Sequence, residues 1–301
     1  MILKANNYKI PSVFEQVTLL DLLELSGNTT LTAKAIKLSQ PTVSRQTQRI
    51  IKELDISLNK KTATYQLKYE SNLCVEYLRR AAQVHRFEKN KIRLGYSIWQ
   101  QAAANKVEQF TPITYGFKHP NLWHELVENY IIDAAIISGL DLSLVINEPL
   151  LDSHSDQLEW KNCLLIRIAN SLLGLLLPPK TRGSPDKWAK IAVPAQRHSP
   201  GLTAIVRQEN YQCLYAKHTC HSAEEWAEWL NEGCYPLIAT EICAKGLLPL
   251  LDSWQWQKWP HEIKEQHWLL VHRENWQNGK AIQQLLEQLK MAISTFYSSG
   301  E

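Results

Sequence analysis

The sequence lacks the long apolar segment that a membrane-spanning helix requires. No stretch approaches about 18 uninterrupted apolar residues. Residues 1–9 are too polar for a signal peptide. The 301 residues are 45% hydrophobic and 21% charged, which is typical of a globular protein with two or three domains. We therefore expect a cytoplasmic protein that has no membrane partner.

Paired cysteines and common catalytic motifs are also missing. The six cysteines include no C-x-x-C pair, which favours reduced thiols over a disulfide framework. No G-x-S-x-G, P-loop or H-E-x-x-H pattern is present, so nothing in the sequence supports an enzyme. His218, Cys220 and His221, with Cys213 nearby, do not have the spacing of a structural zinc site. We predict no metal and no cofactor, and we favour bystander thiols over a redox pair for Cys213 and Cys220.

Tryptophan is absent from residues 1–98, although the chain contains eleven. The charge changes near the same place. Residues 1–91 contain 15 Lys and Arg against 8 Asp and Glu, whereas the remainder contains 18 against 22. These two shifts predict a domain boundary near residue 90. A basic first part joined to an acidic remainder predicts that the first part binds a polyanion.

The first part contains the pattern of three short helices. A helix over 13–26 is predicted from apolar residues at every third position, namely Phe14, Val17, Leu20 and Leu23. Gly27 ends this helix because glycine tolerates the left-handed conformation of a C-cap. The hydroxyl of Thr29 or Thr30 can cap a second helix over 31–37.

The third helix is predicted over 39–54, with Ser39 as N-cap and Pro41 in the first turn. One face carries the buried stripe Val43, Thr47, Ile50 and Leu54. The opposite face carries Gln40, Thr42, Ser44, Arg45, Gln48, Arg49 and Lys52. Gln and Arg can bind base edges in the major groove, while Ser, Thr and Lys bind phosphates. This face therefore predicts a helix that reads double-stranded DNA.

A short basic segment follows the third helix. Residues 56–67 favour β structure and contain Lys60 and Lys61, which is typical of the wing in a winged helix-turn-helix. The predicted DNA-binding residues are Thr30, Gln40, Pro41, Thr42, Ser44, Arg45, Gln48, Arg49, Lys60 and Lys61. Between residues 34 and 61 there are seven Lys and Arg against two acids, which agrees with a phosphate-binding surface.

The run Gly27–Ala33 followed by Ser39-Gln40-Pro41-Thr42-Val43-Ser44 resembles the helix-turn-helix of LysR-type transcriptional regulators. The second block is the specific part of the resemblance. The chain departs from the family pattern in and after the wing: Ile51, Asp55, Asn59, Lys68, Glu70 and Ser71 replace the usual Glu, Gly, Phe, Thr, Ala and Gly. The resemblance implies a divergent regulator that binds operator DNA. The altered wing also motivates an alternative, a ligand-sensing or protein-interaction module of the same architecture without sequence-specific DNA binding.

A further helix is predicted over 70–87, with one stripe formed by Leu73, Tyr77, Ala81 and Val84. In LysR-type regulators this linker helix pairs with its copy in a second subunit. The resemblance therefore implies a homodimer or homotetramer, with those four residues at the dimer contact. A dimer is also expected because two-fold helix-turn-helix proteins read half-sites about one DNA turn apart.

Strands and helices alternate from Lys91 onward, which predicts an α/β domain with parallel strands. The predicted strands include 91–96, 113–117, 133–137, 163–168, 172–177, 237–242 and 267–272. The order resembles the two-lobed, solute-binding-like effector domain of LysR-type regulators. The expected fold is thus a winged helix-turn-helix (1–69), a linker helix (70–90) and an effector domain (91–301). Its first lobe would be 91–160 with 265–301, and its second 161–264.

The cleft between the lobes is the expected site of an unidentified small-molecule effector, because strands end there and helix N-termini supply N–H donors. By position the candidates are Ser97, Phe117, Lys118, His119, Gln196, His198 and Thr240. Their Lys, His and Ser content is compatible with a small anion. The run from Trp254 through Trp256 to Trp259 predicts either a strand with one aromatic face or a patch that binds a partner, and we favour packing between the lobes.

Overall fold

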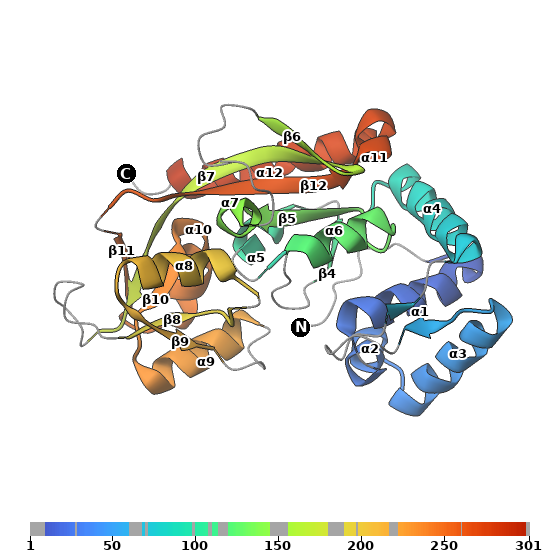
Figure 1. Cartoon of the computed structure of the whole chain (residues 1–301), viewed down its shortest axis with the longest axis horizontal. Coiled ribbons are helices and arrows are strands. Elements are labelled where there is room, and N and C mark those ends of the chain that lie inside the picture. Colours follow the sequence, from blue (N-terminus) through green and yellow to red (C-terminus); the bar gives the residue numbers. More distant parts are fainter. Residues whose placement is uncertain are drawn as a thin grey trace.

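The computed structural model contains an N-terminal helical unit followed by two α/β lobes. It describes residues 10–27, 29–59, 68–69, 72–97, 100–107, 110–113, 120–144, 156–179, 190–196, 198–216, 222–259 and 261–298. Figure 1 shows the helical unit (blue) at one end of the molecule and lobe 2 (yellow and orange) at the other, with lobe 1 between them.

The helical unit has the predicted winged arrangement. Its elements are α1 (Ser12–Ser26), α2 (Thr29–Ile36), α3 (Gln40–Glu53), β1 (Leu58–Asn59) and β2 (Lys68–Tyr69). Gly27 ends α1 with φ of 76°, and its N–H donates to the carbonyl of Leu23. The Ser39 hydroxyl accepts the N–H of Thr42 at the start of α3. The antiparallel pair β1–β2 supplies the two arms of the wing.

One small hydrophobic core joins the helices of this unit. It contains Val17, Leu20, Ala33, Val43, Ile50, Ile56 and Val75. Leu20 on α1 and Val43 on α3 are fully buried in it. Because the two helices share this core, the position of α1 determines the position of α3.

The linker helix α4 (Leu73–Glu88) follows the wing. The Asn72 side chain caps it by accepting the N–H of Val75, and its amide donates to the carbonyl of Leu54 at 2.9 Å. The start of α4 is thereby attached to the end of the third helix. The predicted linker helix is confirmed in place, and it begins a little later than expected.

Lobe 1 is built from elements before and after lobe 2 in the sequence. They are β3 (Ile92–Gly95), α5 (Gln101–Ala104), β4 (Phe110–Ile113), α6 (Pro120–Glu128), β5 (Ala134–Ser138), α7 (Gly139–Ser143), β6 (Gln157–Trp160), β12 (Lys264–His272), α11 (Arg273–Asn278) and α12 (Lys280–Ser298). β3 pairs in parallel with β4 and β5, as the predicted parallel sheet requires. β4 lies before the strand predicted over 113–117, of which only Ile113 is among the described residues. β12 pairs with β5 in the antiparallel sense. α5 is short and has four residues.

Lobe 2 contains the second set of alternating elements. They are β8 (Lys190–Val193), α8 (Pro200–Gln208), β9 (Gln212–Tyr215), α9 (Ala223–Gly233), β10 (Leu237–Thr240), α10 (Glu241–Leu247), η4 (Leu248–Leu250) and β11 (Gln255–Lys258). The run predicted as one strand over 237–242 ends at Thr240, whose hydroxyl caps α10. Trp254 and Trp259 are buried in the core of lobe 2, and the half-buried Trp256 packs against that core. The prediction that they pack between the lobes is therefore wrong.

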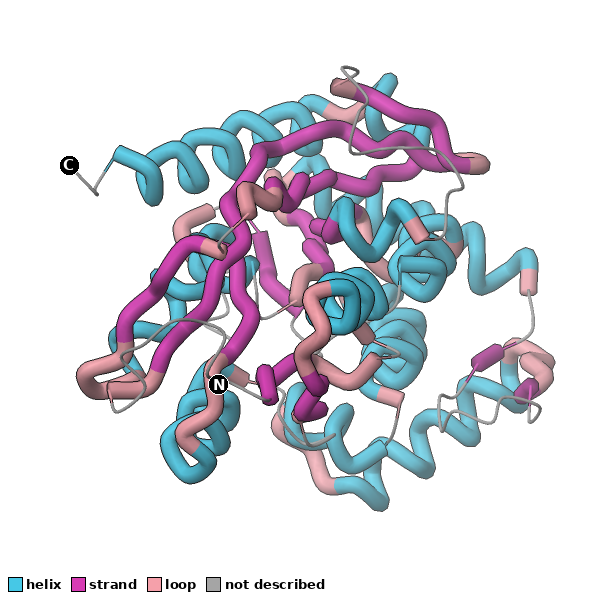
Figure 2. The backbone as a smooth tube through the Cα atoms, turned by 60° about the vertical axis from the view of Figure 1, so that its left-hand side comes forward, coloured by secondary structure: helices cyan, strands magenta, loops and turns pink. Residues whose placement is uncertain are grey.

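One long strand, β7 (Cys163–Leu177), belongs to both lobes. The strand order is β4-β3-β5-β12-β7-β10-β8-β9, and β6 and β11 also pair with β7. Figure 2 shows the strands in magenta and the helices around them in cyan. The two separate strands predicted over 163–168 and 172–177 are thus one strand. The strand continues through the polar residues between the two apolar runs, where the buried Ser171 is paired in register with Glu265 of β12.

Candidate nucleic-acid interface

The third helix presents a buried face and an exposed face. Val43, Thr47 and Ile50 are buried, as the spacing predicts. The predicted contact residues Gln40, Pro41, Thr42, Ser44, Arg45, Gln48 and Arg49 are all exposed or half-buried on the other side. Thr30 is exposed near the start of α2. The helix-turn-helix candidates in the described residues therefore lie on the surface of one unit, while Lys60 and Lys61 lie outside the described residues.

Some candidates already have partners within the unit. The amide of Gln40 donates to the Thr29 hydroxyl at 2.9 Å, which connects α3 to α2. Arg49 forms an exposed ion pair with Glu53 at 2.6 Å, and this carboxylate raises the pKa of the guanidinium. Exposed ion pairs contribute little stability, so a phosphate can replace Glu53. Arg45 and Gln48 are exposed side chains suited to base edges.

The linker helix α4 has an unusual distribution of residues. Its buried face consists of Val75, Arg79, Ala82, Gln83 and Arg86. Its exposed face carries the predicted stripe of Leu73, Tyr77, Ala81 and Val84, and Leu73, Tyr77 and Val84 are 64%, 59% and 57% exposed. A helix that buries arginine and exposes leucine has an apolar surface available to a partner.

The predicted effector residues lie in both lobes. Ser97 follows β3 and is buried, and its N–H donates to the Gln100 side chain at 3.1 Å. Thr240 begins α10, and α10 packs against α5, since a Cβ on Gly246 would lie 3.2 Å from the Cβ of Ala102. Ser97 and Thr240 thus flank one contact between the lobes.

The remaining effector candidates are less informative. Gln196 is exposed in lobe 2, where its side-chain oxygen accepts from Arg207 at 3.4 Å. His198 is half-buried before α8. Phe117, Lys118 and His119 lie outside the described residues, as do the metal candidates His218, Cys220 and His221.

A second contact between the lobes involves residues that the sequence analysis missed. The buried Asp141 carboxylate on α7 accepts the N–H of Gly201 at 2.9 Å and the Ser199 hydroxyl at 3.2 Å, so it caps α8 of lobe 2. A Cβ on Gly201 would lie only 2.5 Å from the carbonyl carbon of Leu140. The sequence offered one indication of this contact, because Asp141 is a charged residue among the mostly apolar residues 136–145.

Glu265 of β12 lies beside Asp141 and completes this acidic pair. Its carboxylate accepts the N–H of Gly139 at the start of α7 at 2.7 Å. Burial raises the pKa of Asp141 to about 7. Burial, together with the neighbouring Asp141, raises the pKa of Glu265 to about 8. On the same strand, burial lowers the pKa of His267 to about 4.

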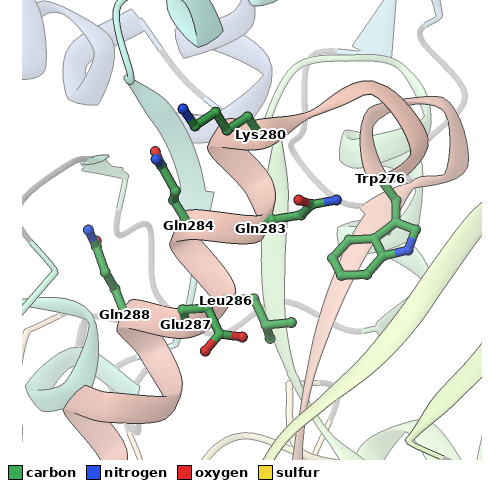
Figure 3. Close-up of a pocket in the computed structure, with 7 residues that line it drawn as sticks. All are labelled: Trp276, Lys280, Gln283, Gln284, Leu286, Glu287 and Gln288. Atoms are coloured by element: carbon green, nitrogen blue, oxygen red, sulfur yellow. The ribbon is translucent and has the colours of Figure 1, made fainter.

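A hollow of about 640 Å³ lies beside α11 and α12 (Figure 3). Its lining consists of Trp276, Lys280, Gln283, Gln284, Leu286, Glu287 and Gln288. Lys280, Gln284 and Gln288 point to one side of α12, whereas Gln283 and Leu286 point to the side of Trp276. These side chains diverge, and none is a predicted effector residue, so we do not assign the effector to this hollow.

No protein-family model and no curated protein matches this sequence. The fold nevertheless resembles that of LysR-type regulators, as comparison with solved structures shows. A peroxide-bound OxyR mutant of Corynebacterium glutamicum aligns with a TM-score of 0.51 at 9% identity, over 97% of this chain and 95% of that chain.

Two further structures of this architecture give lower TM-scores. LysG of Corynebacterium glutamicum with bound arginine effector gives 0.47 at 11% identity, over 92% and 97% of the two chains. CbnR, a LysR family transcriptional regulator, gives 0.46 at 11% identity, over 93% and 98%. At these identities the likeness is one of fold. Within the described residues, no helix is both long enough and apolar enough to span a membrane.

Proposed function

We propose that this protein is a non-enzymatic transcriptional regulator that binds double-stranded DNA through α3. The observation that carries the proposal is the orientation of α3, which buries Val43 and Ile50 and exposes Arg45 and Gln48. Arg and Gln side chains can form paired hydrogen bonds with purine edges in the major groove. The Thr30, Thr42 and Ser44 hydroxyls suit the phosphates on either side. The net positive charge of residues 1–91 supports the same assignment.

The DNA-binding proposal is tested by a gel shift on the DNA upstream of the protein's own gene, over a range of salt concentrations. We expect binding whose affinity falls with a slope of several charges, because phosphate contacts release counterions. Arg45→Ala should weaken binding by about 1–3 kcal/mol if Arg45 contacts a base edge. Lys290→Ala is the matched control, because it removes an exposed cation on the distant α12.

Two results would contradict this proposal. Absence of binding by the wild-type protein at low salt would favour a module of this fold that has lost DNA binding. An unchanged affinity of the Arg45→Ala variant would remove Arg45 from the base-reading set.

We also propose that the protein is a homodimer held by the exposed face of α4. Leu73, Tyr77 and Val84 are large apolar side chains on one side of a helix whose other side is already buried. A second copy of the same face is the partner that fits, because a two-fold pair of α4 helices places two α3 helices on one duplex. Tetramers would require a further contact between dimers.

The dimer is tested with Tyr77→Asp. We expect a loss of about 2–4 kcal/mol of association free energy, because a central aromatic contact is replaced by a charge in an apolar interface. Sedimentation velocity at low micromolar concentration should show dimers for the wild type and monomers for the variant. Met291→Asp is the matched control, since Met291 is an apolar residue on α12 that is 60% exposed. A dimeric Tyr77→Asp protein would refute this interface.

A small-molecule effector between the lobes is the third part of the proposal. Two of the contacts between the lobes, α5 with α10 and α7 with α8, consist of short helices that follow strands. A bound small anion would be expected to raise Tm and to change the emission of the eleven tryptophans, all at Trp99 or later. A series of small carboxylates and phosphate is the first set to measure. No change in Tm or emission with any of them would rule out such an anion.

A further inference from the structure

The helical unit contacts lobe 1 at more than the covalent connection through α4. Its first helix packs on lobe 1 directly, because Leu25 of α1 belongs to the same buried cluster as Trp123 and Leu126 of α6. Leu22 packs against this cluster as well. α1 therefore faces two cores, that of the helical unit on one side and that of lobe 1 on the other.

A buried carboxylate stands at this contact. Asp21 of α1 is 1% exposed. It accepts hydrogen bonds from Arg79 Nε of α4 at 2.7 Å and from Arg93 Nη1 of β3 at 2.5 Å. Arg93 also donates to the Thr18 hydroxyl of α1 at 3.1 Å. One carboxylate thus binds the linker helix and the first strand of lobe 1 at the same time.

A second buried carboxylate repeats the arrangement from the side of lobe 1. Asp133, which precedes β5, accepts from Gln83 of α4 at 2.9 Å and from Arg86 at 2.5 and 3.0 Å. It also accepts the backbone N–H of Arg93 at 2.7 Å. Arg79, Arg86 and Arg93 balance the charges of Asp21, Glu24 and Asp133, so the cluster is neutral when all six are ionised.

The geometry of this cluster is directional. A hydrophobic contact tolerates sliding, whereas buried guanidinium–carboxylate pairs require their partners at defined distances and angles. Moving α1 or α4 relative to β3 would leave a buried charge without its partner, which is costly. The cluster therefore favours one orientation of the helical unit on lobe 1.

We propose that Asp21 is a positioning residue that orients the DNA-reading helix on lobe 1, so that the helical unit, α4 and lobe 1 form one rigid body. The proposal rests on the DNA-binding function proposed above. Because α3 shares a core with α1, holding α1 through Asp21 holds α3. The joint that remains for movement within one chain is then the one between lobes 1 and 2, where β7 and β12 connect them.

Hydrogen exchange of the full-length Asp21→Asn protein tests the rigid attachment without DNA. Asparagine preserves the shape of the side chain but removes the charge that both guanidinium groups require. We expect amides of α1 and α3 to exchange at least about tenfold faster, while those of β12 in lobe 1 and β10 in lobe 2 keep the wild-type rate. Equal acceleration in all four elements, or none in any, would overturn the proposal.

Two further variants make the exchange result specific. Arg80→Ala breaks the exposed ion pair between Arg80 of α4 and Glu274 of α11, and it should leave α3 exchange unchanged. Thr18→Val removes only one bond of Arg93 with little change in volume, and it should give a smaller acceleration in α1 and α3. This milder variant decides the matter if Asp21→Asn does not fold. Wild-type exchange in Thr18→Val would then count against the proposal.

DNA binding supplies the second measurement. Asp21 is buried away from the exposed face of α3, so a positioning role predicts weaker binding of Asp21→Asn to a fragment long enough for a dimer, with the salt slope of the wild type. Unchanged affinity, or a salt slope lost together with the affinity because the unit has unfolded, would overturn it. If the wild type binds no DNA, the proposed function fails, and the exchange experiment still decides whether the attachment is rigid.

Discussion

Asp133→Ala should lower the free energy of unfolding by about 3–5 kcal/mol. Asp133 is 0% exposed and is hydrogen-bonded to Gln83, Arg86 and the backbone of Arg93. Arg86 is only 4% exposed. Without Asp133, its buried guanidinium loses the carboxylate to which it donates two hydrogen bonds. Removing one partner of a buried pair costs more than the pair contributes, because the other charge remains desolvated.

Urea unfolding followed by tryptophan fluorescence measures this loss, because all eleven tryptophans lie at Trp99 or later and report on the effector lobes. Asp156→Ala is the matched control. Asp156 is also paired with an arginine, Arg167 at 3.7 Å, but its side chain is 87% exposed, so the change should cost less than about 1 kcal/mol. A loss below about 1 kcal/mol for Asp133→Ala would show that its buried contacts contribute no more than an exposed pair.

Stability should fall as the pH rises from about 6 to 8, because Asp141 and Glu265 are buried acids with raised pKa values of about 7 and 8. At pH 6 both hold protons in the folded state and have released them in the unfolded state, whose pKa values are near 4. Raising the pH therefore favours the unfolded state. His267, with its pKa lowered to about 4, has the opposite effect, but only below about pH 6.5.

Glu265→Gln tests this dependence. Between pH 6 and 8, the free energy of unfolding should fall by about 2 kcal/mol less in the variant than in the wild type. Each fully coupled proton changes this free energy by about 1.4 kcal/mol per pH unit. Urea unfolding at several pH values gives the slope. Glu262→Gln is the control, because that exposed carboxylate has its pKa lowered by Lys258 and Lys264 and stays ionised throughout the range. If the stability of Glu265→Gln fell with pH as steeply as that of the wild type, Glu265 would not be a source of the pH dependence.

Local patterns predicted the helical unit closely because its elements depend on neighbouring residues. Ser39 caps α3 by a bond to the N–H of Thr42, three residues away, and Gly27 ends α1 by a bond to Leu23. Capping, helical periodicity and the Ser39–Ser44 block all operate within one or two turns. The buried and exposed faces of α3 could thus be predicted residue by residue, whereas the contacts of Gln40 with Thr29 and of Arg49 with Glu53 could not.

The effector lobes were predicted in order but not in detail. The apolar runs around Asn170 and Ser171 read as two strands, because a polar pair ordinarily interrupts a buried strand. Only the pairing of β7 with β12 places Ser171 opposite Glu265 and continues the strand through both lobes. The contact of α7 with α8 was missed for the same reason, since Asp141 and Gly201 are far apart in the sequence.

The apolar stripe on α4 illustrates how the two levels differ. Periodicity identified Leu73, Tyr77 and Val84 as one face, and the fold shows that this face is exposed. The side of α4 that is buried instead carries Arg79 and Arg86, residues that composition assigns to solvent.

The sequence by itself determined the three-helix unit, its basic exposed face and the alternation of strands and helices. These follow from interactions between residues that are close along the chain. Only the tertiary structure decided which face of α4 is buried and how the units are joined. Asp21, Asp133 and Arg93 each stood as a charge within an apolar run. Their partners come from distant segments, and a buried charge is stable only where the fold brings an opposite charge to it.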